Sequence, residues 1–226
     1  KQRPARPEWH QRSGTNYVAR LAACGCTPDD VDIVMCTHLH ADHVGWNTRL
    51  DNGRWVPTFP NARYVFDKTE FDYWTETNAK AEVPPFVDSV LPVVEAKRAE
   101  LVGNDFAIGD HMRILPTPGH TPGHMSFAVG TPDQGIFVTG DFVTSPMGFL
   151  QPDVGTATDS DPELAAVALH DAVDGGEADA GAVEEGDLVG RAAARVGAVD
   201  DGADRGDGGL GDQAIGDGML GLADGD

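Results

Sequence analysis

The sequence predicts an α/β fold, because segments with strand character alternate along the chain with segments of helical character. Short apolar runs bounded by turn residues, such as 31–36 and 136–139, have the length of buried strands. Apolar residues make up 40% of the 226 residues, which is enough for one sizeable core. The composition changes at residue 166, so we expect one folded domain over 1–165 and a tail over 166–226.

The first predicted elements are a short helix and a buried strand. Residues 15–25 are typical of a helix that Thr15 caps and Gly25 ends. Its expected apolar face consists of Tyr17, Val18, Leu21 and Ala22. The strand at 31–36 leads directly into the stretch "CTHLHADHVG", so these polar side chains lie on a loop at a strand end.

The other predicted elements follow the same alternation. They are a strand at 62–66, a helix opening near Lys68, a helical stretch over 84–102 interrupted at Pro92, a strand, loop and strand over 111–129, and a strand at 136–139. The last strand ends in Gly140 and Asp141. Two loops of polar residues therefore follow strands, at 117–124 and at 140–141.

The tail over 166–226 is acidic and of low complexity. Gly, Ala and Asp make up 40 of its 61 residues, and no aromatic residue follows Phe149. Such a segment buries too little apolar surface to offset its ordering entropy, so we expect it to be disordered or poorly packed. A frame-shifted reading of a GC-rich gene, a natural acidic tail and a Gly/Asp calcium-binding repeat are the three explanations that stay open.

Charge and cysteine content limit the partners and the compartment. A net charge of −21 argues against nucleic acid as a partner. No stretch approaches the ~20 apolar residues of a membrane span, so no membrane partner is expected. Cys24, Cys26 and Cys36 predict reduced thiols in a cytoplasmic protein, with Cys24 and Cys26 as a metal half-site the alternative. The polar start without Met predicts that upstream sequence is missing.

The stretch 38–43 carries three histidines and an aspartate. Imidazole nitrogen and carboxylate oxygen are the usual ligands of Zn²⁺ and similar ions. His38 and His40 project to the same side of an extended segment, and Asp42 and His43 follow as the chain turns. Four such ligands crowd one ion but can be divided between two neighbouring ions. Gly45 is expected to allow a tight backbone turn after them. A polar loop with surface histidines is the alternative.

"THLHADH" at 37–43 has the pattern H-x-H-x-D-H, and it resembles the signature of the metallo-β-lactamase superfamily. "TPGHTPGH" at 117–124 is similar to the next metal-binding loop of that family, and "VTGD" at 138–141 to its bridging carboxylate. The resemblance covers roughly 15–165 and implies the family's αββα sandwich. The sandwich is expected to be incomplete, because the family's first strands and its last metal-binding histidine have no counterpart here.

The resemblance also implies which residues bind metal. His38, His40 and His120 would hold one zinc ion, Asp42 and His43 a second, and Asp141 would bridge the two. His124 is expected to support these ligands rather than to be one. The remaining histidines are expected to be solvated or structural, and two further acids to be ordinary surface groups: His10, His111, His170, Asp67 and Asp110. His170 is a poor match for the missing ligand, because its segment is predicted to be helical.

The implied function is hydrolysis of an ester, lactone or related bond in a small molecule by a hydroxide shared between two zinc ions. Asp42 would also accept or guide a proton. Two alternatives remain: a metal-binding but catalytically defective fragment that lacks the last histidine of the second site, and a redox member with one iron. A homodimer is one option, since the sequence does not decide the oligomeric state.

The expected substrate pocket is apolar at its mouth. Trp46, Phe142, Met147 and Phe149 are its predicted lining, with Trp55 and Phe59 as further candidates and core packing as the alternative for each. Quorum-signal lactonases of this family carry a Tyr shortly after the bridging Asp, whereas this sequence has Phe142 and Thr144 there. That difference counts against the specific lactonase function.

Overall fold

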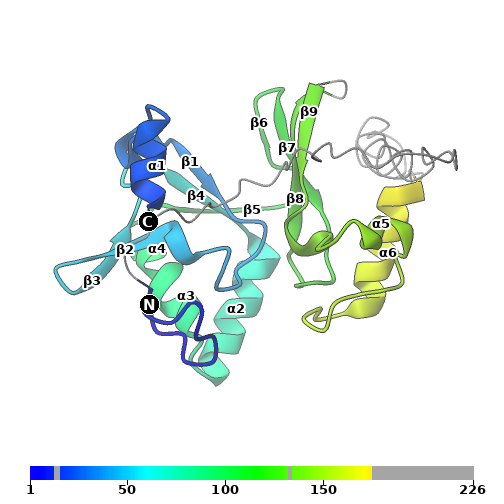
Figure 1. Cartoon of the computed structure of the whole chain (residues 1–226), viewed down its shortest axis with the longest axis horizontal. Helices are drawn as coiled ribbons and strands as arrows, with labels where there is room; N and C mark the ends of the chain where they lie inside the picture. Colours follow the sequence, from blue (N-terminus) through cyan, green and yellow to red (C-terminus); the bar gives the residue numbers. More distant parts are fainter. Residues whose placement is uncertain (13–15, 132–133, 175–226) are drawn as a thin grey trace, which may run out of the picture.

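Two β-sheets pack against each other at the centre of the computed structural model, which describes residues 1–12, 16–131 and 134–174 (Figure 1). One is a parallel sheet in the order β1 (Ile33–Met35), β4 (Arg63–Asp67) and β5 (Ala99–Val102). The other is antiparallel, in the order β6 (Ala107–Ile108), β7 (Met112–Pro116), β8 (Met125–Thr131) and β9 (Gln134–Val138). The predicted α/β class is confirmed.

Strand β4 is buried on both faces, as expected for the central strand of a parallel sheet. Tyr64 and Phe66 point to one side, into a cluster with Phe86 and Val93 from the covering helices. Val65 points to the other side and joins a cluster formed by these residues of β5, β7 and β8: Val102, Ile114, Met125 and Phe127. The second cluster is the contact between the two sheets.

Helices flank the pair of sheets on both sides (Figure 1). Those beside the parallel sheet are α1 (Tyr17–Ala23), α2 (Lys68–Lys80), α3 (Pro84–Ser89) and α4 (Leu91–Glu95). Those beside the antiparallel sheet are α5 (Met147–Leu150) and α6 (Pro162–Asp174). The described residues also form three single 3-10 turns: η1 (Pro28–Asp30), η2 (Gly45–Asn47) and η3 (Gly140–Phe142).

The start of α2 corrects one prediction. Asp67, expected to be an ordinary surface acid, is 6% exposed and caps this helix by accepting a hydrogen bond from the Glu70 N–H at 2.9 Å. Burial raises the pKa of Asp67, although its backbone hydrogen bonds oppose that shift. The prediction was wrong because the sequence alone does not distinguish an Asp that caps a helix from an Asp on the surface. Asp110 is exposed, as predicted.

The stretch 84–102 was predicted to be helical throughout, and its last part is a strand. The helical stretch breaks between Ser89 and Leu91, and Pro92 lies in the first turn of α4, where its missing N–H costs no hydrogen bond. Lys97 has a φ of +57° and ends this helical region. The next residues pair with β4 as strand β5, because a third strand extends the sheet.

A hairpin at 48–57 was not predicted. Strand β2 (Thr48–Asp51) pairs with β3 (Arg54–Pro57) through a turn at Asn52 and Gly53, whose φ angles are +48° and +80°. Asn-Gly is the preferred dipeptide for such two-residue turns, so the sequence did contain the signal.

The ends of the described chain bear on three other predictions. Helix α1 is confirmed, and Gly25 follows it with a φ of +80°, whereas the predicted cap Thr15 lies outside the described residues. Helix α6 runs across the predicted boundary at 165 and buries Leu169, so the change in composition at 166 does not coincide with the end of regular structure. The predicted disorder of the remaining tail concerns 175–226, outside the described residues.

Among the helices described, none has the length and apolarity needed to cross a membrane.

Candidate metal centre

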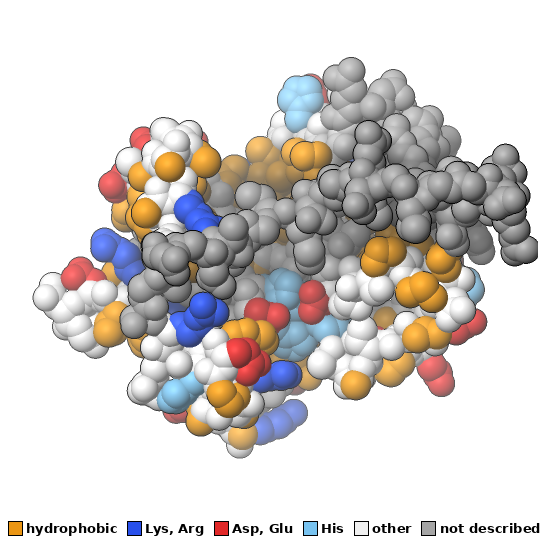
Figure 2. All heavy atoms as spheres, viewed as in Figure 1, with side chains coloured by type: hydrophobic (Ala, Val, Ile, Leu, Met, Phe, Trp, Pro, Cys, Tyr) orange, Lys and Arg blue, Asp and Glu red, His pale blue; other side chains and the backbone are white. Residues whose placement is uncertain are grey.

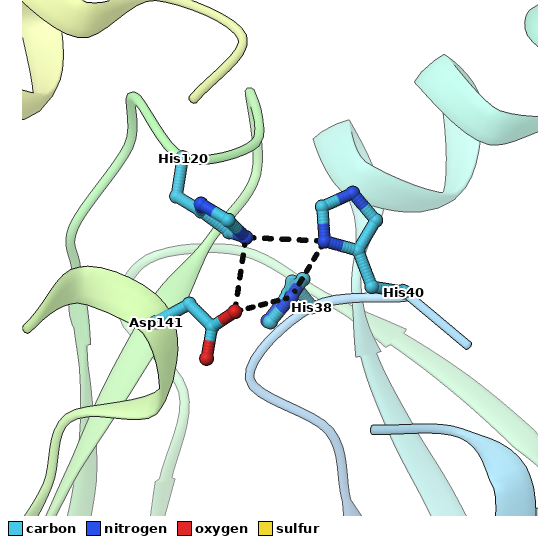
Figure 3. Close-up of side chains that lie close together, drawn as sticks. All are labelled: His38, His40, His120 and Asp141. Carbon is cyan, nitrogen blue, oxygen red and sulfur yellow. Dashed lines mark hydrogen bonds and ion pairs between the residues drawn. The ribbon is translucent and has the colours of Figure 1, made fainter. Parts of the chain in front are cut away.

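Four side chains from three separate loops converge at one edge of the two sheets (Figure 3). His38 and His40 lie on the loop after β1, His120 on the loop between β7 and β8, and Asp141 on η3 directly after β9. One ligand atom from each of these residues lies within 4.8 Å of the others. Residues up to about 100 positions apart in the sequence therefore meet at the point predicted from the motifs.

The donor atoms of the three histidines face one another. Nδ1 of His40 lies 3.0 Å from Nε2 of His38 and 3.1 Å from Nε2 of His120. Oδ2 of Asp141 is 3.2 Å from Nε2 of His120 and 3.8 Å from Nε2 of His38 (Figure 3). Ligands of one tetrahedral Zn²⁺ lie about 3.3 Å apart, since Zn–N distances are about 2.0–2.1 Å. The spacing thus fits one ion between these four atoms.

The second oxygen of Asp141 points toward another group. Its Oδ1 lies 3.2 Å from Nε2 of His43, and that nitrogen lies 3.7 Å from Oδ2 of Asp42. Asp141 therefore stands between the three-histidine cluster and the pair formed by Asp42 and His43. This arrangement brings together all six of the predicted ligands.

Burial keeps most imidazoles of the cluster neutral. Burial, followed by the neighbouring histidines, lowers the pKa of His38 far below its usual range, and burial with the nearby His120 lowers the pKa of His40 to about 4. Neutral imidazole is the form that binds metal ions. Hydrogen bonds from His120 and then His43 strongly lower the pKa of Asp141, so its carboxylate is ionised.

His124 supports Asp141, as predicted for a supporting histidine. It is 1% exposed, and its Nε2 accepts a hydrogen bond of 3.1 Å from the backbone N–H of Asp141. Its proton must then lie on Nδ1, which donates to the Thr117 hydroxyl at 2.8 Å. Thr117 in turn bonds to Ser126, whose hydroxyl donates to the carbonyl of Thr139. The chain of hydrogen bonds fixes the tautomer of His124 and the start of η3.

Asp159 orients His120, and the sequence analysis missed it. Its Oδ1 accepts a hydrogen bond of 2.8 Å from Nδ1 of His120, which directs Nε2 into the cluster. The N–H and the hydroxyl of Thr156 both donate to the same carboxylate. Burial opposes a charge on His120, but the carboxylates of Asp141 and Asp159 outweigh it and raise the pKa of His120. Asp159 belongs to no motif and follows Asp141 by 18 residues, so only the fold identifies it.

Glu70, also missed, joins two of the loops. This carboxylate is 1% exposed and accepts hydrogen bonds from the N–H of Leu39 at 3.0 Å and the N–H of Gly123 at 3.1 Å. Its Oε1 also accepts from the indole of Trp74 at 2.7 Å. Leu39 separates His38 from His40, and Gly123 belongs to the loop of His120, so one carboxylate on α2 holds both loops in register.

Three glycines allow the loops to approach so closely. A Cβ on Gly123 would lie 2.2 Å from the backbone nitrogen of Glu70, and one on Gly119 would lie 2.3 Å from that of Ala165 in α6. Gly140 has a φ of +56°, and a Cβ there would lie 2.7 Å from the side chain of Thr37. By contrast, a Cβ on Gly45 would meet no atom within 4 Å, so the expected tight passage at Gly45 is not present.

Two cavities open beside the cluster. One of about 410 Å³ is lined by His40, His120 and Asp141 together with Asp42, whose side chain is 45% exposed. The other, of about 550 Å³, also borders Asp42 and is lined by Trp46 and Trp55 among others. Figure 2 shows histidine and acidic side chains in the hollow at the centre of this face.

The predicted apolar lining is only partly found there. Trp46 lines the larger cavity, while Phe142 is 9% exposed and borders a small cavity of about 30 Å³ next to His120 and Asp141. Met147 and Phe149 lie on α5 and line neither of the two larger cavities. Phe59 belongs to the core, which was the alternative stated for it.

The other histidines lie elsewhere. His10 accepts a hydrogen bond from the N–H of Arg3 and His111 is exposed, so both agree with the prediction of structural or solvated groups. His170 lies on α6, where its Nε2 contacts Oδ1 of Asp153 at 3.0 Å. Among the described residues, no histidine that follows Asp141 in the sequence joins the cluster.

Comparisons with known proteins agree with this geometry. The sequence profile of the Metallo-beta-lactamase superfamily matches residues 5–207. The chain is 27% identical over 115 residues to the N-acyl homoserine lactonase AiiA of Bacillus thuringiensis subsp. kurstaki, covering 51% of this chain and 39% of that protein. It is 30% identical over 132 residues to the N-acyl homoserine lactonase AttM of Azorhizobium caulinodans, covering 55% of this chain and 45% of that protein. The matched region thus spans less than half the length of these relatives.

Solved structures share the fold. The hydrolase AbOPH, of the beta lactamase superfamily, has a TM-score of 0.60 and 28% identity, covering 73% of this chain and 59% of that one. The dizinc quorum-quenching lactonase AidC has a TM-score of 0.59 and 21% identity, again covering 73% of this chain and 59% of that one. At this identity, the similarity to AidC is evidence for the fold only. The predicted αββα fold is thereby confirmed. Since the profile covers most of the sequence, the chain belongs to the metallo-beta-lactamase superfamily.

Proposed function

We propose that this protein is a metal-dependent hydrolase that holds two zinc ions and cleaves an ester or lactone bond in a small molecule. The observation that carries the proposal is the position of Asp141. Its Oδ2 faces Nε2 of His120 at 3.2 Å, and its Oδ1 faces Nε2 of His43 at 3.2 Å. A carboxylate with one oxygen toward each of two ligand groups suits a pair of ions, whereas a single ion would use only one of these oxygens.

The donor set fits zinc. His38, His40, His120 and Oδ2 of Asp141 would hold the first ion, since three imidazoles and one carboxylate suit a tetrahedral Zn²⁺. Asp42, His43 and Oδ1 of Asp141 would hold the second, leaving positions open for water or substrate. The second group is also the more exposed, as a substrate-facing site requires.

Side chains near these ions would have separate roles in proton transfer and in positioning the ligands. When bound, a pair of zinc ions lowers the pKa of water and polarises a scissile carbonyl. Asp42 borders both cavities, so its carboxylate can accept the proton of the attacking water and pass it to the departing alkoxide. His124 and Asp159 keep Asp141 and His120 in place, which reduces the reorganisation that the reaction requires.

The relatives support the class of bond. Two of them are N-acyl homoserine lactonases, and a solved structure with 27% identity and a TM-score of 0.51 is an N-acyl homoserine lactone hydrolase with its product N-hexanoyl-L-homoserine bound at the catalytic metal centre. Lactones and esters share the carbonyl that such a site would attack. Phe142 lacks the hydroxyl of a Tyr, so we propose the ester and lactone class and not a specific signal molecule.

Metal content and hydrolysis test the proposal together. The purified full chain should contain two equivalents of zinc by elemental analysis after zinc loading and desalting. A panel of aryl esters, lactones and phosphotriesters should show turnover of esters or lactones that chelation abolishes and zinc restores. Iron in place of zinc, with oxygen consumption, would instead support the redox alternative.

A second candidate is a metal-binding protein with little catalysis. It is favoured by the second ligand group, where the described residues supply only Asp42, His43 and the shared Asp141. Such a protein would bind one zinc ion tightly and a second weakly. One equivalent of zinc after desalting, with no turnover when excess zinc is present, would decide for this candidate.

A further inference from the structure

The larger cavity concentrates positive charge in a strongly acidic protein. Lys1, Arg3, Arg12 and Arg49 line it, and Asp42 is the one acid among the described residues that line it. Within the described part of the chain, it thus gathers four of 13 Lys and Arg but one of 23 Asp and Glu. In Figure 2, Lys and Arg side chains appear around the left and lower rim of the central hollow. Such a local excess against a net charge of −21 indicates that the cavity attracts an anion.

Two of these cations already have partners. The Arg3 guanidinium forms a two-pronged ion pair with the Asp88 carboxylate, at 2.8 Å and 2.9 Å. Lys1 donates hydrogen bonds to Thr48, Ser89 and the carbonyl of Gly45. These two residues fix the wall of the cavity and are not free to bind a ligand.

The other two cations are free. Within the described part of the chain, Arg12 and Arg49 make no ion pair and no side-chain hydrogen bond, and both are exposed. A guanidinium presents a planar fork of donors that matches a carboxylate. Both arginines can therefore bind an acidic group without losing an existing partner.

Aromatic rings form the apolar part of the same cavity. Three of the four tryptophans in the chain line it: Trp9, Trp46 and Trp55. Trp46 stacks on Tyr17 with ring centroids 4.7 Å apart, and the Lys1 ammonium lies 4.9 Å from the centre of the Trp55 ring. These contacts hold the rings in place, and fixed aromatic rings are efficient surfaces for an apolar ligand.

The cationic cavity continues into the metal centre. Arg3, Trp9, Ala41 and Asp42 line both this cavity and the one that reaches His40, His120 and Asp141. A molecule of modest length can thus place one end at the three-histidine cluster and the other beside the free arginines. Asp42 lies at the junction.

We infer that the substrate carries a carboxylate at the end remote from the bond that is cleaved, bound by Arg49 and Arg12, with an apolar linker against the tryptophans. This inference rests on the proposed function, because it names the substrate of that site. We infer a carboxylate, with one negative charge, and not a phosphate, with two. The two free guanidiniums attract either group, but the negative protein and the carboxylate of Asp42 repel the doubly charged group more strongly.

Matched esters test the inference through kinetics. The zinc-loaded full chain should hydrolyse mono-4-nitrophenyl adipate with a kcat/KM about tenfold above that of the neutral 4-nitrophenyl methyl adipate, mainly through KM. The preference should fall about tenfold in Arg49→Gln and decrease in 0.5 M NaCl. Arg54→Gln is the control, because it removes the same charge from the same hairpin, and Arg54 does not line the cavity. Equal kcat/KM for both esters, or equal losses in both variants, would overturn the inference.

An equilibrium measurement keeps the inference testable if no ester is hydrolysed. In that case the proposed function fails, and the binding of adipate and of its uncharged diamide to the chelator-treated protein is compared by calorimetry, so that no zinc ion can bind the second carboxylate. Adipate should bind about tenfold more tightly to the wild type and to Arg54→Gln, and this advantage should disappear in Arg49→Gln with Arg12→Gln. Equal binding of adipate and diamide, or an advantage that survives the double substitution, would refute the cationic site.

Discussion

The backbone N–H of Asp141 donates a hydrogen bond of 3.1 Å to Nε2 of His124. Through this contact a side chain that faces neither proposed ion fixes the residue that faces both. The turn at Asp141 is a single 3-10 turn after the edge strand β9, and its one buried side chain is that of Phe142. The position of the proposed bridging carboxylate therefore depends on a buried histidine from the loop before β8.

Removing that acceptor should weaken metal binding without removing a ligand. In His124→Phe the N–H of Asp141 loses its partner, so we expect the affinity for the first zinc ion to fall about 10–100-fold. Competition with a chromophoric chelator measures this affinity. His111→Phe changes an exposed histidine and should keep the wild-type value. An unchanged affinity in a folded His124→Phe protein would mean that Asp141 needs no such support.

Glu70 should contribute to stability more than to chemistry. Replacement by Gln leaves one acceptor oxygen for three N–H donors, from Leu39, Gly123 and Trp74. At least one buried donor loses its partner, which costs about 1–3 kcal/mol of unfolding free energy. Chemical denaturation of Glu70→Gln and of Glu76→Gln, an exposed position on the same helix, measures the difference. Equal stabilities would show that the loops do not depend on this carboxylate.

A methyl group at Gly123 should be far more disruptive than one at Gly45. The Cβ of Gly123→Ala would lie 2.2 Å from the nitrogen of Glu70 and 2.3 Å from Oδ1 of Asp67, while that of Gly45→Ala would meet no atom within 4 Å. Overpacking against backbone cannot be relieved by a rotamer change, so we expect a loss of about 1–3 kcal/mol or more at Gly123. Thermal unfolding of the two variants compares them. Similar melting temperatures would contradict the close approach of the loop to α2.

The stability of the metal-free protein should fall as the pH is lowered. Burial, and then His120, lowers the pKa of His124 to about 3, against an ordinary value of 6.5. A lowered histidine pKa stabilises the fold fully above pH 6.5, and this stabilisation is lost as the pH falls from 6.5 toward 3. The slope reaches about 1.4 kcal/mol per pH unit for each such histidine.

Urea unfolding at pH 7.5, 6.5 and 5.5 in the presence of a chelator measures this slope. His124→Phe should lose less stability over that range than the wild type, whereas His111→Phe should match the wild type. The comparison is needed because the pKa of His120 is raised, which acts in the opposite direction. Identical slopes for the wild type and His124→Phe would contradict a buried neutral imidazole at this position.

The ligand motifs could be predicted from the sequence because their residues are close together in it. His38, His40, Asp42 and His43 follow one strand, and each of these positions carries a side chain of a type that binds metal ions. Asp159 and Glu70 could not be predicted in this way, because each contacts a loop 39 or 31 residues away through a single carboxylate. Acids of this kind are common on surfaces, and only the packing of α2 and the segment before α6 reveals their partners.

The same reasoning explains the errors in the fold. Ala99–Val102 was assigned to a helix because its local pattern is ambiguous, whereas pairing with β4 makes it a strand. The Asn52-Gly53 turn was a local signal that was overlooked. Met147 and Phe149 were predicted to line the pocket because they are apolar, yet they lie on α5 and line neither of the two larger cavities.

Single histidine substitutions should separate the two proposed ions. His40 lies within the three-histidine cluster, so His40→Ala should lose the first zinc ion and all metal-dependent hydrolysis. His43 contacts Oδ1 of Asp141 at 3.2 Å and lies outside that cluster, so His43→Ala should retain about one equivalent of zinc and lose the second. Elemental analysis after desalting gives both numbers, with His170→Ala as the control. If His43→Ala kept two equivalents, or if undiminished hydrolysis survived in His40→Ala, the division of ligands on either side of Asp141 would be wrong.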